Sequence, residues 1–159
     1  MIELSLVGVR VELPSNQPIV LLKEATGDRY LPIWIGAVEA TAIAFALQGI
    51  QTPRPMTHDL MRDMLTEANI EVERIVISEL VDQTFYANIR MSGNGGSIDV
   101  SSRPSDAIAL AVRLGSPIFS AEEVLEQAGI ELKDDEEVEV EKFREFLDQV
   151  TPEDFANEG

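Results

Sequence analysis

The sequence contains no cysteine and only one histidine, His58. Without cysteine the chain has no disulfide, no thiolate nucleophile and no thiolate ligands for zinc. A metal site would therefore have to use oxygen ligands, with His58 as the single available imidazole. The lack of cysteine also fits a reducing compartment, so we expect a cytoplasmic protein.

Basic residues are scarce. The chain has 12 Lys and Arg residues against 29 Asp and Glu residues, and its formal net charge is −17 at pH 7. Such a charge repels nucleic acid, whose binding normally draws on a positive surface that releases counterions. Much of the excess is local, because twelve acidic residues and only three basic ones lie between Glu131 and Glu158. A neutral or basic cleft elsewhere in the chain is compatible with this composition.

Long apolar runs are also missing. The most apolar window, from Leu31 to Leu47, is interrupted by Pro32, Gly36 and Glu39 and is shorter than the roughly 20 apolar residues of a membrane helix. The chain does not begin with the basic and apolar segment of a secretion signal. We therefore expect neither a membrane span nor export.

Several common catalytic motifs do not occur. The sequence has no phosphate-binding loop ending in Gly-Lys-Ser/Thr, no Gly-x-Gly-x-x-Gly, no His-Glu-x-x-His and no Gly-x-Ser-x-Gly. A serine triad would have to rely on His58, and nothing in the spacing supports one. Any catalytic site must be sought among polar residues placed by the fold.

The composition, with 45% apolar and 26% charged residues in 159, is that of one ordinary folded domain. Alternating apolar residues predict a bulged strand over 2–13, a hairpin over 18–35 and a three-stranded meander over 71–102. Helices are predicted over 37–48, 57–68, 104–114 and 121–128. Because strands and helices do not alternate regularly, we expect an α+β domain with a mostly antiparallel mixed sheet packed by several helices.

We assign this domain to residues 1–130 and an acidic, partly helical C-terminal tail to residues 131–159.

Trp34 and Tyr86 could stack nucleic-acid bases, but both lie in strand patterns that favour packing in the core. The helix over 57–68 should present one apolar stripe, and Thr57 should cap its start.

Polar residues gather at the predicted starts of three otherwise apolar helices. The residues are Arg103, Ser105 and Asp106 at one helix, Glu39 at a second, and Arg54, His58 and Asp59 at a third. Helix N-termini carry unpaired amide groups and partial positive charge, so three of them together would suit a phosphodiester. An arginine can grip phosphate, and carboxylates can hold a divalent cation that activates water.

A structural interpretation of the same residues stands beside the functional one. Asp106 and Glu39 also complement the helix dipole, and Arg103 can simply pair with either of them. His58 fits an ordinary residue near a helix cap, and Asp59 fits a solvated acidic face. The positions of these side chains in the folded protein discriminate between the structural and the functional interpretation. Convergence of two carboxylates on an open cleft would favour catalysis, whereas caps and buried ion pairs would favour a structural role.

Four stretches of the chain, taken in order, resemble the bifunctional nuclease domain family over about residues 2–130. The stretches are RYLPIWIGAVEATAI, RPMTHDLMRDML, TFYANI and IDVSSRPSDAIALAVRLGSPIF. The resemblance implies an α+β domain that forms a homodimer or larger homo-oligomer and acts on both DNA and RNA. The polar positions within the matching stretches are Arg29, Glu39, Arg54, His58, Asp59, Arg103, Ser105 and Asp106.

Our first hypothesis is a nuclease that hydrolyses phosphodiester bonds in DNA and RNA with little sequence preference and with the help of Mg²⁺ or Mn²⁺. Three sets of roles follow. The catalytic residues are Asp106, His58, Glu39 and Asp59; the substrate-binding residues are Arg103, Arg54, Ser105 and Arg29; the metal ligands are Asp106, Glu39 and Asp59. The alternative is a non-catalytic oligomeric binding or regulatory module in which these charges form structural networks.

Overall fold

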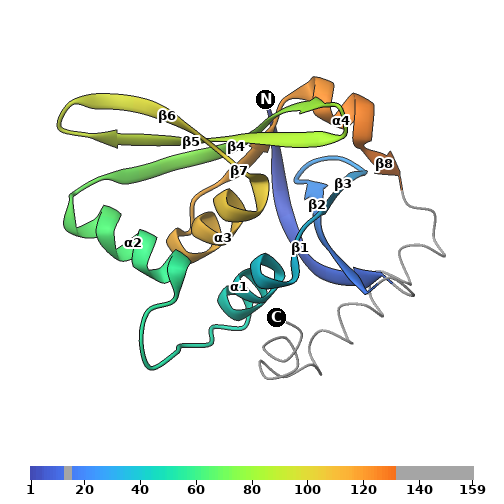
Figure 1. Cartoon of the computed structure of the whole chain (residues 1–159). Helices are drawn as coiled ribbons and strands as arrows, with labels where there is room; N and C mark the ends of the chain where they lie inside the picture. The colour runs from blue at the N-terminus through green and yellow to red at the C-terminus, as the bar shows by residue number, and fades with distance from the viewer. Residues whose placement is uncertain (13–15, 132–159) are drawn as a thin grey trace.

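In the computed structural model, which describes residues 1–12 and 16–131, the chain forms one mixed sheet with helices packed against it (Figure 1). The described strands are β1 (Ile2–Glu12), β2 (Gln17–Glu24), β3 (Arg29–Trp34), β4 (Glu71–Val81), β5 (Thr84–Gly93), β6 (Gly96–Ser102), β7 (Ile118–Ser120) and β8 (Ile130–Glu131). Their order in the sheet is β6-β5-β4-β7-β1-β2-β3-β8. The pairing of β4 with β7 is parallel and the other described pairings are antiparallel. The predicted α+β class is confirmed.

Local sequence accounts for the strand connections. The register between β1 and β2 slips between Leu6 and Gly8, which confirms the bulge predicted from the change of phase. The β4–β5 hairpin turns at Asp82 and Gln83, both with positive φ, as a two-residue hairpin turn requires. Strands β4, β5 and β6 therefore form the predicted meander, with β6 as an edge strand.

The described helices are α1 (Ala37–Leu47), α2 (Thr57–Glu67), α3 (Pro104–Leu114) and α4 (Glu122–Ala128). Six consecutive residues of α1, from Ala40 to Phe45, are buried, as its apolar composition on every face predicts. Helix α3 packs against α1, α2 and the sheet, and buried residues of α1, α3 and α4 share one core with the sheet. Helix α3 thus lies beside two other helices, α1 and α2 (Figure 1).

The apolar stripe of α2 is partly buried: Met61 and Leu65 pack against the core, and Leu60 and Met64 are 51% and 61% exposed. Two expectations about single residues are wrong. Trp34 is 51% exposed and Tyr86 is 43% exposed, although core packing was expected of both. Each lies on a strand face that α1 and α3 leave uncovered, which a strand pattern alone does not reveal.

A further correction concerns the start of α2. Its N-cap is Met56 rather than Thr57, and the carboxylate of Asp59 accepts a hydrogen bond from the Met56 amide at 3.1 Å. Among the described residues no helix is long and apolar enough to cross a membrane. The acidic tail expected over 131–159 lies outside the described residues from Leu132 onward.

Candidate functional site

The N-terminus of α3 presents an exposed arginine of the predicted site. Arg103 is the N-cap residue and Pro104 occupies the first helical position, where its fixed φ and missing amide proton cost nothing. The guanidinium of Arg103 donates through Nε to Asp106 Oδ2 at 2.9 Å and lies 2.9 Å through Nη1 from Glu39 Oε1. Residues from α1 and α3 therefore meet at one guanidinium.

Asp106 extends this contact to α2. Its second oxygen, Oδ1, lies 2.9 Å from Nε2 of His58. Glu39, Arg103, Asp106 and His58 thus form a continuous polar chain, which we call the helix-end cluster. The structure brings together four of the predicted site residues, from three helices, although His58 and Asp106 are 48 positions apart in the sequence.

Exposure falls from Arg103 through Asp106 to His58, and the side chain of Glu39, on the other side of Arg103, is 17% exposed. The side chain of Arg103 is 64% exposed, that of Asp106 is 28% exposed, and that of His58 is only 9% exposed. An anionic ligand arriving from solvent would therefore meet Arg103 first, with Asp106 behind it and His58 behind Asp106. In this cluster Arg103 is accessible to solvent, whereas the imidazole of His58 is almost fully buried.

The electrostatics of the cluster favour an ionised Asp106. Burial by itself would raise the pKa of this carboxyl group, but hydrogen bonds from Arg103 and His58, together with the positive charge of Arg103, lower it below its ordinary value. The same carboxylate and that of Glu39 raise the pKa of Arg103. Asp106 is thus an anion that holds a cation on one side and an imidazole on the other.

Asp59 lies one residue from His58 but belongs to a different contact. Its Oδ1 accepts a hydrogen bond from Arg113 at 2.7 Å, and the Arg113 side chain is only 5% exposed. Burial would raise the pKa of Asp59, but the hydrogen bonds from Arg113 and from the Met56 amide lower it. Of the carboxylates considered from the sequence, Glu39 and Asp106 converge on an exposed guanidinium, whereas Asp59 lies in a buried ion pair.

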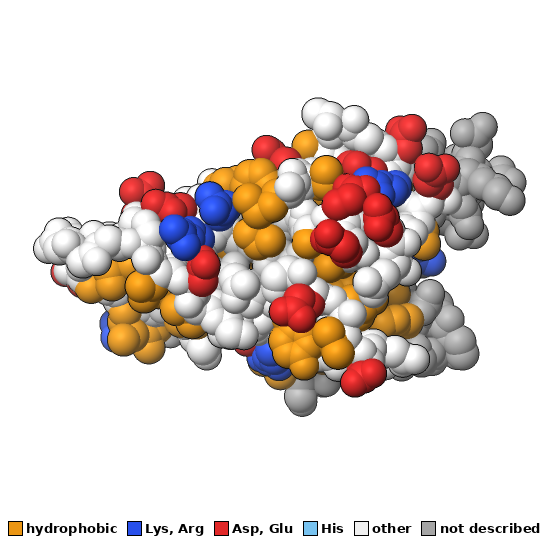
Figure 2. Space-filling view, turned by 90° about the horizontal axis from the view of Figure 1, so that it is seen from above, with side chains coloured by type: hydrophobic (Ala, Val, Ile, Leu, Met, Phe, Trp, Pro, Cys, Tyr) orange, Lys and Arg blue, Asp and Glu red, His pale blue; other side chains and the backbone are white. Residues whose placement is uncertain are grey.

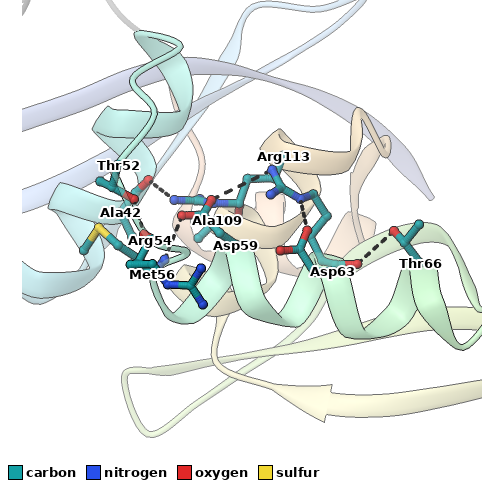
Figure 3. Close-up of polar contacts among 10 residues, drawn as sticks. Ala42, Thr52, Arg54, Met56, Asp59, Asp63, Thr66, Ala109 and Arg113 are labelled. Atoms are coloured by element: carbon teal, nitrogen blue, oxygen red, sulfur yellow. Dashed lines mark hydrogen bonds and ion pairs between the residues drawn. The ribbon is translucent and has the colours of Figure 1, made fainter.

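The remaining predicted residues lie around the cluster or away from it. Ser105 is 6% exposed in the first turn of α3, so its hydroxyl group is largely covered. Arg54 is exposed in the loop between α1 and α2, and its carbonyl oxygen accepts a hydrogen bond from Thr52 (Figure 3). Arg29 donates hydrogen bonds to Glu24 and Glu122, which raise its pKa. It joins β3 to α4 and does not contact the helix-end cluster.

Arg29 lies between two carboxylates, those of Glu24 and Glu122. On the face drawn in Figure 2, red side chains gather toward the end of the molecule where α4 lies, with few Lys or Arg side chains among them. This distribution agrees with the net charge of −17. Phosphate binding in the described part of the chain would therefore depend on a few placed arginines rather than on a broad basic surface.

A metal ion would have few protein ligands at the cluster. Within residues 1–12 and 16–131 no group of three or more His, Asp or Glu side chains is arranged to hold one. Glu39 and Asp106 nevertheless contact the same guanidinium, so two carboxylates face one point. This donor set suits Mg²⁺, which is usually bound by one or two carboxylates together with waters and substrate phosphates.

Two residues that matter for this geometry were missed from the sequence. Arg113, in the last turn of an apolar helix, ties Asp59 to the protein interior. Gly36 has an ordinary extended conformation, with φ −81° and ψ 163°, so its backbone does not require glycine. A Cβ atom at this position would overlap Oε2 of Glu39. Gly36 therefore leaves the space that the Glu39 carboxylate occupies, which no sequence pattern signals.

Comparison with known proteins agrees with the resemblance. The bifunctional nuclease domain matches residues 20–133. A Mycobacterium tuberculosis protein described only as uncharacterized is 51% identical over 162 residues, covering 96% of this chain and 97% of its own length. Bifunctional nuclease 2 of Arabidopsis thaliana is 31% identical over 112 residues, and bifunctional nuclease 1 of Oryza sativa subsp. japonica is 29% identical over 106 residues.

These matches cover 67% and 65% of this chain, but only 34% and 32% of the plant proteins, which are much longer. The family match alone spans more than half of the chain and contains every member of the helix-end cluster. The chain therefore belongs to the bifunctional nuclease domain family.

Proposed function

We propose that this protein is a nuclease that hydrolyses phosphodiester bonds in DNA and RNA with little sequence preference. The plant relatives are named bifunctional nucleases, and the family match supports the same class of activity here. The observation that carries the proposal is the Asp106 carboxylate, which joins an exposed arginine to a buried histidine. Such an array can bind a phosphate and orient a group for proton transfer.

Arg103 is the residue that would bind the phosphodiester. Its guanidinium matches the geometry of a phosphate, and it is the most exposed member of the cluster. In the free protein this guanidinium neutralises Glu39 and Asp106. When Arg103 turns toward a bound phosphate, the two carboxylates lose their cation and become available for another.

Glu39 and Asp106 would hold a divalent cation, Mg²⁺ or Mn²⁺. When bound, such an ion stabilises charge on the phosphate and lowers the pKa of a bound water. Asp59, also named as a ligand from the sequence, is engaged by Arg113 and would join only after leaving that buried pair. We therefore assign the cation to Glu39 and Asp106.

His58 would assist proton transfer from behind Asp106. Because its side chain is only 9% exposed, it acts through the Asp106 carboxylate that it contacts, and it orients this carboxylate. Arg54 is exposed in the loop directly before α2 and would add a second positive charge for the nucleic-acid backbone. Ser105 and Arg29, which are covered or already paired, would contribute less.

A non-catalytic oligomeric module is the second candidate, and two observations favour it. Glu39, Asp59 and Asp106 are all paired with arginines in the free protein. The edge strand β6 exposes Ile98 and Val100, at 58% and 41%, which would suit contact with another chain. A homo-oligomer in the cytoplasm is compatible with either function and is part of our proposal.

Cleavage assays distinguish the two functions. We expect the purified protein to cut single-stranded RNA and both linear and circular DNA with Mg²⁺ or Mn²⁺, and to lose this activity in EDTA. Arg103→Ala should lower kcat/KM at least tenfold, because a charge-assisted contact to phosphate is lost. Equal cleavage by both preparations would indicate a contaminating enzyme. A lack of cleavage under every condition would favour the binding module.

Gly36→Ala tests the role of Glu39 without changing a charge. The added methyl group should push the Glu39 carboxylate away from Arg103 and lower cleavage to the level of Glu39→Gln. The backbone at Gly36 accepts alanine and the displaced group is the end of a flexible side chain, so we expect a stability loss of about 1 kcal/mol or less. Urea unfolding and cleavage rates would measure the two effects.

Gly95→Ala is the matched control, because a Cβ atom there meets nothing within 4 Å. It should leave cleavage unchanged. If Gly36→Ala cleaves nucleic acid at the wild-type rate, the position of the Glu39 carboxylate does not matter for the reaction.

A further inference from the structure

A single buried guanidinium joins three helices in this protein. Arg113 donates through Nε to the Asp59 carboxylate of α2 at 2.7 Å, through Nη1 to the Ala109 carbonyl of α3 at 2.8 Å, and through Nη2 to the Ala42 carbonyl of α1 at 3.0 Å (Figure 3). Its side chain is only 5% exposed. Within a well-covered region, one residue therefore makes a directional bond to each of α1, α2 and α3.

The same three helices supply the helix-end cluster. Glu39 lies on α1, His58 on α2, and Arg103 and Asp106 at the start of α3. The cluster exists only if the three helices keep a fixed relative placement, because its ion pairs and hydrogen bonds join side chains from different helices. A misplacement of about 1 Å in a catalytic group can cost a factor of about 10² in rate.

Each bond of Arg113 falls within one helical turn of a cluster residue. Ala42 is three positions after Glu39, Asp59 follows His58 directly, and Ala109 is three positions after Asp106. Three residues along a helix correspond to a rise of about 4.5 Å. Arg113 therefore fixes each helix close to the point where that helix presents its polar side chain.

Only arginine can make this set of contacts. The planar guanidinium directs donors toward three acceptors at once, whereas a lysine ammonium is a single point charge on a flexible stem. The carboxylate of Asp59 balances the buried positive charge, and the carbonyl groups of Ala109 and Ala42 accept one hydrogen bond each from Nη1 and Nη2. This site therefore requires both the positive charge and the planar shape of a guanidinium.

We propose that Arg113 is a positioning residue that holds α1, α2 and α3 in the placement required by the helix-end cluster. It does not touch the substrate, and it acts through Glu39, His58 and Asp106. The kinetic part of this inference rests on the proposed nuclease function. The structural part does not, because it concerns the contact between His58 and Asp106 in the free protein.

His58 provides a direct readout, since it is the only histidine in the chain and gives one set of imidazole signals. The experiment compares ring proton and nitrogen NMR signals of the full-length wild type with those of Arg113→Lys at one fixed pH. It also measures thermal unfolding, and kcat and KM on single-stranded RNA with Mg²⁺. We expect a folded variant with shifted or broadened imidazole signals, a kcat lowered at least tenfold and a KM within about twofold of wild type.

Two further variants complete the design. In Arg113→Met/Asp59→Asn both charges of the buried pair are removed together, so the double variant avoids an uncompensated buried charge and should show the same change at His58. Arg62→Met is the matched control. Arg62 lies on α2, pairs with Asp63 at 3.0 Å and lies 4.0 Å from the Asp59 carboxylate, but these ion pairs stay within α2, and its side chain is 38% exposed. Its loss should leave the imidazole signals and kcat unchanged.

The proposal is overturned if folded Arg113→Lys and the double variant both retain the wild-type imidazole signals. If Arg113→Lys does not fold, the imidazole signals of the double variant are compared with those of the wild type instead. Asp59→Asn is a milder change than the double variant, because asparagine keeps an acceptor oxygen facing Arg113. If no preparation cleaves nucleic acid, the proposed function fails, while the imidazole comparison still decides the role of Arg113.

Discussion

Replacing Asp106 with asparagine is expected to lower nucleic-acid cleavage at least a hundredfold while leaving the fold intact. The carboxylate accepts hydrogen bonds from Arg103 and contacts His58, and asparagine keeps its size but removes its charge. A positioned group that takes part in proton transfer contributes typically 10²- to 10⁴-fold to rate. Single-turnover cleavage of labelled RNA, measured for wild type and variant purified identically, would give this ratio.

The stability of the Asp106→Asn protein should change little. The pair between Asp106 and Arg103 is partly exposed to solvent, and such pairs contribute up to about 1 kcal/mol to the free energy of unfolding. Asp99→Asn is the matched control, because Asp99 also pairs with an arginine, Arg90, but on the edge strand β6. The control should cleave within twofold of wild type. Equal losses in both variants would show that the effect is not specific to the cluster.

Replacing Asp59 with alanine is expected to lower the free energy of unfolding by about 3 kcal/mol, because it leaves the buried guanidinium of Arg113 without a counter-charge. The same change removes the acceptor for the Met56 amide at the start of α2. Urea unfolding followed by circular dichroism would measure the loss. Asp63→Ala, four residues along the same helix, removes an exposed ion pair with Arg62 and should cost less than about 1 kcal/mol.

The cost of Asp59→Ala should depend on pH in a defined direction. The pKa of Asp59 is lower in the folded protein than its ordinary value, so this group adds stability above about pH 4 and loses that contribution as the pH falls through its folded-state pKa. The difference between wild type and Asp59→Ala should therefore be full at pH 7 and shrink below about pH 4. A difference that stays constant down to pH 2.5 would show that the ion pair is not its cause.

Asp59 and Asp106 illustrate where prediction from sequence stops. Both occupy the first turn of a helix with a proline at or shortly before its start, and both were named as metal ligands and catalytic groups. The structure gives them different partners. Asp59 faces a buried arginine from the far end of α3, whereas Asp106 faces an exposed arginine at the near end of the same helix. Identical residue types with similar local sequence therefore acquire different surroundings.

Local patterns were sufficient for much of the fold. The bulge in β1, the meander of β4–β6 and the burial of α1 follow from apolar periodicity and turn residues that lie within about ten positions of one another. Patterns failed where the exposed side of an element depends on its neighbours. Trp34 and Tyr86 look like core residues in sequence, but their side chains are 51% and 43% exposed.

The sequence by itself determined the α+β class, the family and the set of polar residues worth considering, because these depend on local order and on motifs. Only the tertiary structure decided which of those residues meet. The contacts of Arg103 with Glu39 and Asp106, and of Asp106 with His58, join three helices, and Arg113 bonds to residues up to 71 positions away. Such contacts are fixed by how the helices pack on the sheet and on one another. The local sequence around each residue does not predict that packing.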